Sequence, residues 1–248
     1  MIGKLKNKRI WLIPTALLLI IVICLSVIII KEEREKNQNA EKYKEMVEIT
    51  PPPQEETQEV FVPAMDFTEL QAQNSDIYAW IDIPDTVVSY PMLRSEQEDF
   101  YLDHNADKQK SVYGAIYTQS YNSDDFEDFN TIIYGHDMKN GTMFGSLKKY
   151  RNREYFDEHQ YINVYTPEKN LTYRIFAAYV YDDRHILYSF DFENESTRRV
   201  YISDILSGKF GGNINSEVAV TAEDKIITLS TCTGVKTQRY LVQAVLVE

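Results

Sequence analysis

Apolar and charged runs divide the chain into distinct parts. Residues 10–30 carry no charge over 21 positions, and a helix of that length spans roughly 30 Å, the hydrocarbon thickness of a bilayer. Residues 31–60 are charged and contain three consecutive prolines, which is typical of a stalk with a stiff spacer. The pattern therefore predicts a basic tail at 1–9, a transmembrane anchor at 10–30, a stalk or linker at 31–60 and one globular domain at 61–248.

The globular part is predicted to consist mainly of β-strands. Runs rich in Val, Ile, Tyr and Thr, bounded by turn residues, occur at 78–83, 86–92, 111–118, 130–135, 161–166, 171–181, 225–232 and 239–247. A short amphipathic helix is predicted at 66–74, and further helices fit at 142–150, 152–158 and around 192–207. Eight short strands in one domain favour a closed barrel or a sandwich, and the helices make the fold mixed rather than purely β.

The residues that flank the apolar run predict how the chain is oriented in the membrane. The segment before it is purely basic, and the segment after it is mixed in charge, so the N-terminus should stay in the cytoplasm and the domain should be extracytoplasmic. The alternative is a cleavable signal peptide. The run is too long for one, and residues 31–34 offer no small-x-small cleavage site. We expect a single-pass protein of the cell membrane.

Charge and composition exclude several classes of function. The chain has 26 Lys and Arg against 38 Asp and Glu, and the part after residue 10 has 22 against 38, a net charge of −16. Such a surface repels phosphate backbones, so a nucleic-acid partner is not expected. The two cysteines are too few for a disulfide framework or a four-thiolate zinc site. HExxH, G-x-S-x-G and glycine-rich phosphate-loop motifs are absent, and we expect neither a metal nor an organic cofactor.

Cys232 is the candidate nucleophile. Cys24 falls inside the predicted anchor, so Cys232 is the lone thiol of the domain, and it closes the predicted strand at 225–232 among small polar neighbours. A free thiol is only a few per cent thiolate at neutral pH, so a nucleophilic cysteine needs a base or a cation nearby. The alternative is a buried structural cysteine.

His136 and Arg239 are the candidate partners of that thiol. His136 follows an apolar strand and Gly135, which would let the backbone turn sharply, whereas His104, His159 and His185 lie among polar residues and are interpreted as solvated loop histidines. Arg239 opens the last strand, seven residues after the cysteine, so a short hairpin-like loop would return it near the thiol. Its permanent charge suits a substrate carbonyl or an oxyanion. A structural histidine and a surface arginine are the alternatives.

Three motifs resemble those of the sortases, and more narrowly the class B sortases of Gram-positive bacteria. They are TLSTC (228–232), IIYGHDM (132–138) with MFGSL (143–147) downstream, and RYLV (239–242), and the resemblance covers most of 61–248. It implies a closed eight-stranded β-barrel with N-terminal helices and a helix-bearing insertion, here 182–210, before the penultimate strand. It also implies that Cys232 is the nucleophile, that His136 transfers protons, and that Arg239 positions the substrate and stabilises the oxyanion.

The resemblance further implies a membrane-anchored cysteine transpeptidase. Such an enzyme cuts a C-terminal sorting signal at a Thr-Gly-like or Thr-Asn-like bond and holds the product as a thioester. The expected partners are surface proteins bearing that signal and the amine of a peptidoglycan cross-bridge or its lipid-linked precursor. Besides the catalytic residues, candidates for substrate contact are Ser230, Thr231, Tyr188 and Ser189.

Two features depart from the class B pattern, and two other functions remain open. The seven-residue separation of Cys232 and Arg239 is shorter than usual and puts the usual substrate contacts of that loop in doubt. Asp137 stands where an Asn often follows the histidine, and its carboxylate either raises the histidine pKa or faces solvent. The alternatives are a pilus-assembling sortase that uses a pilin lysine as nucleophile, and a cell-wall peptide-binding barrel that has lost catalysis.

Overall fold

The computed structural model describes residues 25–31, 33–34, 37–38, 41–42 and 65–248. Residues 25–31 are helical. The predicted cytoplasmic tail and most of the predicted anchor and stalk lie outside the described residues. Among the helices that are described, none is long and apolar enough to cross a membrane. The division of the chain before residue 61 therefore stays a prediction.

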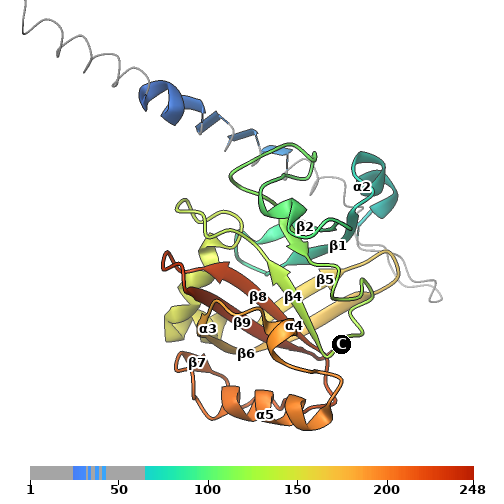
Figure 1. Cartoon of the computed structure of the whole chain (residues 1–248), viewed down its shortest axis with the longest axis vertical. Helices are drawn as coiled ribbons and strands as arrows, with labels where there is room; N and C mark the ends of the chain where they lie inside the picture. The colour runs from blue at the N-terminus through green and yellow to red at the C-terminus, as the bar shows by residue number, and fades with distance from the viewer. Residues whose placement is uncertain (1–24, 32, 35–36, 39–40, 43–64) are drawn as a thin grey trace, which may run out of the picture. The chain divides into compact units, whose positions relative to one another are not determined.

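Eight strands within residues 65–248 close into a β-barrel (Figure 1). The strands are β1 (Ile77–Asp82), β2 (Ser89–Arg94), β3 (Ile116–Thr118), β4 (Asn130–Tyr134), β5 (Tyr161–Tyr165), β6 (Asn170–Asp182), β8 (Ile226–Cys232) and β9 (Gln238–Leu246). Their order around the barrel is β5-β1-β2-β3-β4-β8-β9-β6, and β6 pairs with β5 to close the ring. All eight predicted strands are confirmed, and closure decides for the barrel over the sandwich. The unpredicted β7 (Asn213–Ile214) has only two residues and pairs with the edge of β6 that is opposite to β9.

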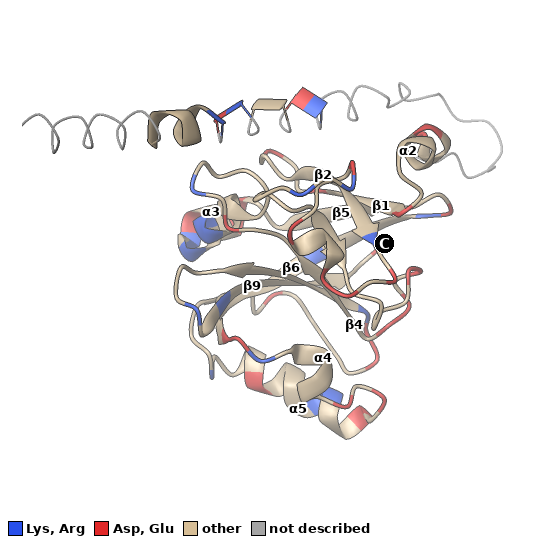
Figure 2. Ribbon diagram, turned by 45° about the horizontal axis from the view of Figure 1, so that its top comes forward, with Lys and Arg blue, Asp and Glu red and all other residues tan. Residues whose placement is uncertain are grey.

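Within residues 65–248, one helix precedes the first strand and the other helices lie in connections between strands. They are α2 (Phe67–Gln73), η1 (Phe100–Leu102), η2 (Gly145–Arg151), α3 (Arg153–Glu158), α4 (Ile186–Ser189) and α5 (Glu195–Leu206). The Asp66 carboxylate caps α2 by accepting the amides of Thr68 and Glu69. Helices α4 and α5 lie between β6 and β8, so the helix-bearing insertion before the penultimate strand is confirmed. Most charged side chains lie on helices and loops, whereas the barrel strands carry few (Figure 2).

A buried hydrogen-bond network fixes α5 to the barrel wall. The fully buried Gln243 of β9 accepts from the Tyr179 hydroxyl of β6 at 2.8 Å. Its amide nitrogen donates to the Tyr201 hydroxyl of α5 and to Thr228 of β8, each at 2.8 Å. Thr228 in turn donates to Asn130 of β4 at 2.8 Å. A buried polar network of this kind is costly unless each member is paired, so it specifies one position for the insertion helix.

Candidate active site

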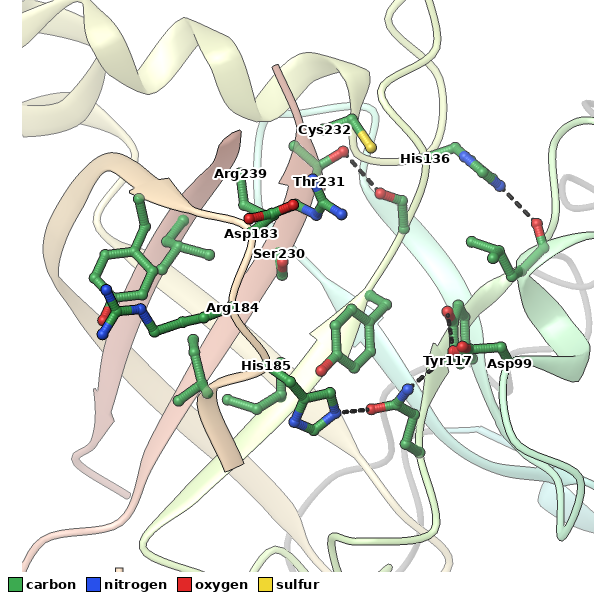
Figure 3. A pocket seen from close by; sticks show the side chains of 18 of the residues that line it. Asp99, Tyr117, His136, Asp183, Arg184, His185, Ser230, Thr231, Cys232 and Arg239 are labelled. Carbon is green, nitrogen blue, oxygen red and sulfur yellow. Dashed lines mark hydrogen bonds between the residues drawn. The ribbon is translucent and has the colours of Figure 1, made fainter. Parts of the chain in front are cut away.

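The registers of three neighbouring strands, β4, β8 and β9, bring the predicted catalytic residues into one row. Parallel strands β4 and β8 pair Tyr134 with Ser230, and continuing that register by two residues sets His136 beside Cys232. Antiparallel strands β8 and β9 pair Cys232 directly with Arg239. The three residues thus lie beside one another at the ends of β4 and β8 and the start of β9 (Figure 3), although His136 and Cys232 are nearly 100 residues apart in the sequence.

A pocket of about 230 Å³ opens beside this row (Figure 3). Cys232, His136 and Arg239 line it, and so do Ser230 and Thr231. The described structure therefore brings together five of the seven residues that the sequence suggested. Tyr188 and Ser189 of α4 are exposed and are not part of the pocket lining. Their contact with a substrate stays a prediction.

The Cys232 thiol is exposed and free, so the alternative of a buried structural cysteine is wrong. The residue before it, Thr231, is buried, and its hydroxyl donates to the Gly135 carbonyl at 2.7 Å. Gly135 also donates its amide to the Ser230 carbonyl at 3.2 Å. These two bonds continue the β4–β8 pairing beyond Tyr134 and hold the backbone of the thiol against the backbone of the histidine.

Gly135 serves close packing rather than a sharp turn. Its φ is not positive, so the conformation does not itself require glycine. A Cβ atom there would lie 2.5 Å from Cδ1 of Ile116 and 2.7 Å from Cδ2 of Phe144. The prediction that Gly135 allows a sharp turn was therefore wrong. A larger residue is excluded because it would collide with the side chains of Ile116 and Phe144.

The His136 ring is held by a backbone carbonyl. Its Nε2 lies 2.6 Å from the carbonyl oxygen of Leu102, at the end of η1. Figure 3 shows that this bond points away from Cys232, so the ring lies between the thiol and the carbonyl. The neighbouring Asp137 carboxylate instead pairs with Lys148 Nζ of η2 at 2.7 Å. Asp137 therefore neither bonds the histidine nor faces solvent freely.

Arg239 keeps part of its guanidinium free for a ligand. Its Nη1 donates to the carbonyl oxygens of Lys236 at 3.1 Å and Gln238 at 2.9 Å, which fixes the side chain against its own loop. Among the described residues, no carboxylate pairs with it and its Nε and Nη2 have no hydrogen-bond partner. Two planar N–H donors directed from a fixed fork suit a carbonyl oxygen or a developing oxyanion.

A chain of hydrogen bonds lines the opposite end of the pocket. Asp99 accepts from the Tyr117 hydroxyl at 3.2 Å and from Nε2 of Gln119 at 2.9 Å. The Oε1 of Gln119 lies 2.6 Å from Nε2 of His185, which belongs to the insertion. Burial raises the pKa of Tyr117 and lowers the pKa of His185. The chain links the insertion to the loop before η1 across the pocket (Figure 3).

The three other histidines lie in loops, as the sequence predicted, but they are half-buried and stack on aromatic rings, so the prediction that they are solvated was wrong. His185 lines the pocket and stacks on Tyr188 with ring centroids 4.1 Å apart. His104 stacks on Phe100 at 4.0 Å, and His159 stacks on Tyr155 at 3.9 Å. In the last two pairs the residues are four apart in sequence, the spacing at which side chains meet on a helical turn, so this signal was available. The sequence around Asp99, Tyr117 and Gln119 did not indicate a role in the site, because only tertiary folding brings these residues to the pocket.

Comparisons with known proteins agree on one family. A model of the sortase domain matches residues 81–247. Sortase B of Listeria monocytogenes serovar 1/2a is 35% identical over 164 residues, 66% of this chain and 65% of that protein, so the match spans just under two thirds of the relative's length. Sortase B of Staphylococcus aureus is 30% identical over 67% of each chain. The crystal structure of sortase B from Bacillus anthracis in complex with AAEK1 superposes with a TM-score of 0.75 at 30% identity, covering 87% of this chain and 99% of that one.

Proposed function

The chain belongs to the sortase family, with sortase B proteins among its relatives, and we propose that it is a cysteine transpeptidase that joins proteins to the cell wall. It cleaves a C-terminal sorting signal through a thioester on Cys232 and transfers the protein to a peptidoglycan amine. One observation carries this proposal: an exposed thiol, an imidazole and a partly free guanidinium stand in one row at the mouth of one pocket.

In the first half-reaction, the Cys232 thiolate attacks the carbonyl carbon of the scissile peptide bond. A carbon–sulfur bond forms, and the carbonyl π electrons move to the oxygen, where the Nε and Nη2 donors of Arg239 stabilise the negative charge. The tetrahedral intermediate then collapses and the carbon–nitrogen bond breaks. Protonated His136 gives its proton to the departing amine, so a thioester and a neutral histidine remain.

In the second half-reaction, an acceptor amine resolves the thioester. Neutral His136 takes a proton from the amine as its nitrogen attacks the thioester carbon. Arg239 again stabilises the oxyanion, and the carbon–sulfur bond breaks to return Cys232 to the thiolate. The histidine ends protonated as it began, so the cycle balances without a cofactor. Two half-reactions that share one acyl-enzyme predict ping-pong kinetics.

We also propose that residues 10–30 anchor the chain in the cell membrane with the barrel outside. The 21 uncharged residues and the basic segment before them support this placement. Tethering raises the effective concentration of enzyme near substrates that emerge at the membrane. Membranes from cells that express the full chain should retain it after alkaline extraction, whereas deletion of 10–30 should release it. Equal extraction of both forms would contradict the proposal that residues 10–30 anchor the chain.

Intact mass spectrometry of the full-length chain with a panel of sorting-signal peptides tests the reaction. A mass gain equal to the acyl fragment of one peptide is expected, and that peptide identifies the motif. Cys232→Ala should show no adduct while its circular dichroism and melting temperature match the wild type. Adduct formation by the alanine variant, or no adduct with any peptide while an alkylating reagent labels Cys232, would contradict the proposal. Adding cell-wall amines or a lysine-bearing pilin peptide to the thioester then distinguishes cell-wall from pilus acceptors.

A further inference from the structure

The bond between His136 and Leu102 determines which ring nitrogen carries a fixed proton. A backbone carbonyl oxygen can only accept a hydrogen bond, and His136 Nε2 lies 2.6 Å from the carbonyl oxygen of Leu102. Nε2 must therefore be the donor, both in the neutral ring and in the protonated ring. The remaining nitrogen, Nδ1, is then the one that gains and loses a proton. Asp137 does not compete for this role, because its carboxylate is paired with Lys148.

The turn that carries the Leu102 carbonyl is held in place by contacts of its other residues. It ends η1, whose middle residue Tyr101 is buried and donates its hydroxyl to Asp76 at 2.6 Å. The Tyr101 carbonyl accepts the amide of Ala115 at 2.9 Å. Asp99 precedes η1 and has a φ of 54°, a left-handed conformation that is uncommon outside glycine. Its carboxylate is bound by the side chain of Gln119 at 2.9 Å, which ties the turn to the end of β3.

Gly114 lets this turn approach the histidine. Its φ is +53°, and a Cβ atom there would lie 2.7 Å from the carbonyl oxygens of Leu102 and Tyr101 and 3.0 Å from Cδ2 of His136. A side chain at this position would have to push the carbonyl and the ring apart. The glycine thus lies against both partners of the hydrogen bond that orients the ring, and its small size is a requirement of that bond.

We propose that η1 is a positioning element for His136: the Leu102 carbonyl fixes the Nε2–H, Gly114 provides the space for it, and Nδ1 is left to exchange protons with Cys232 and the amines. A neutral carbonyl here orients the imidazole as a third group does in a catalytic triad. The inference rests on the proposed function only in giving His136 the proton-transferring role. The hydrogen bond itself can be tested without any substrate.

Nuclear magnetic resonance of the full-length chain with ¹⁵N-labelled histidine tests the bond directly. The ¹⁵N chemical shifts of the neutral ring in the wild type should show a proton on His136 Nε2, assigned by the loss of the signal in His136→Gln. No such proton, or one attached to Nδ1, would overturn the inference. Because this spectrum needs neither a variant at Gly114 nor a peptide, it decides even if Gly114→Ala does not fold or no peptide reacts.

A pair of glycine variants tests the positioning role. Gly141 also has a positive φ, +82°, but a Cβ atom there meets nothing within 4 Å, so Gly141→Ala carries the same kind of backbone strain without the contact. We expect Gly114→Ala to lose the Nε2 proton signal and to form the thioester about 10- to 100-fold more slowly, the effect of a displacement of roughly 1 Å. Gly141→Ala should keep the signal and stay within about twofold of the wild type. Equal rates in the two variants would show that the contact with Leu102 and His136 does not matter.

Discussion

Replacing Thr231 by valine tests whether the link between strands β8 and β4 positions the catalytic pair. Thr231 is 3% exposed, and its hydroxyl donates to the Gly135 carbonyl at 2.7 Å, one residue before Cys232 on one strand and one residue before His136 on the other. Valine keeps the shape of threonine and replaces its hydroxyl with a methyl group. The backbone bond from the Gly135 amide to the Ser230 carbonyl, at 3.2 Å, remains in the variant.

The magnitude follows from what the substitution removes. A net hydrogen bond contributes about 0.5–1.5 kcal/mol, and a buried acceptor left unpaired costs about 1–3 kcal/mol. Gly135 is only half-buried, so solvent compensates part of that loss and we expect about 1–2 kcal/mol of destabilisation. The variant loses one of the two hydrogen bonds that join the backbones next to Cys232 and His136. We expect this loss to lower kcat about tenfold, which corresponds to an activation free energy higher by roughly 1.4 kcal/mol.

Thr231→Ser is the matched control for this variant. Serine keeps the hydroxyl and loses a buried methyl group, which costs about 1 kcal/mol. The two variants should therefore have similar free energies of unfolding in urea, while only Thr231→Val loses kcat for peptide cleavage. Equal kcat in the two variants would refute the positioning role. A rise in KM at unchanged kcat in Thr231→Val would assign the hydroxyl to substrate binding instead.

Three further variants test other parts of the structure. Arg239→Lys should lose most of its thioester-forming activity because lysine lacks the planar fork, and near-normal turnover would remove Arg239 from the catalytic set. Gln243→Leu should lower the free energy of unfolding in urea by about 2–4 kcal/mol, since it removes the acceptor of the buried Tyr179 hydroxyl and the donor that lies 2.8 Å from the buried Tyr201 hydroxyl, and a loss below about 1 kcal/mol would contradict the network. Burial holds the pKa of His185 below its ordinary value of 6.5, so as the pH falls past that value the unfolded chain binds the proton first and stability decreases. Between about pH 7.5 and pH 5 the melting temperature of His185→Gln should therefore fall less than that of the wild type. Equal decreases would show that another group is responsible for the loss of stability.

Much of the barrel could be predicted from local sequence because strand formation leaves a local pattern. The runs that became β1 to β6, β8 and β9 are rich in β-branched and aromatic residues and end at turn residues. The two-residue β7 and the four-residue α4 are too short to leave such a pattern, and their backbones are set by the strands and side chains around them. The same holds for η1, which is stabilised by contacts with distant residues rather than by its own composition.

The sequence by itself determined the chemical groups of the site: one thiol outside the apolar run, a histidine after a strand, and an arginine at the start of the last strand. Only the tertiary structure decided how they meet, because register between β4, β8 and β9 depends on the packing of the whole barrel. It also decided that the Leu102 carbonyl holds His136 and that His185 lies in the pocket. A hydrogen bond to a backbone carbonyl leaves no trace in residue type, and burial depends on neighbours that are far away in sequence.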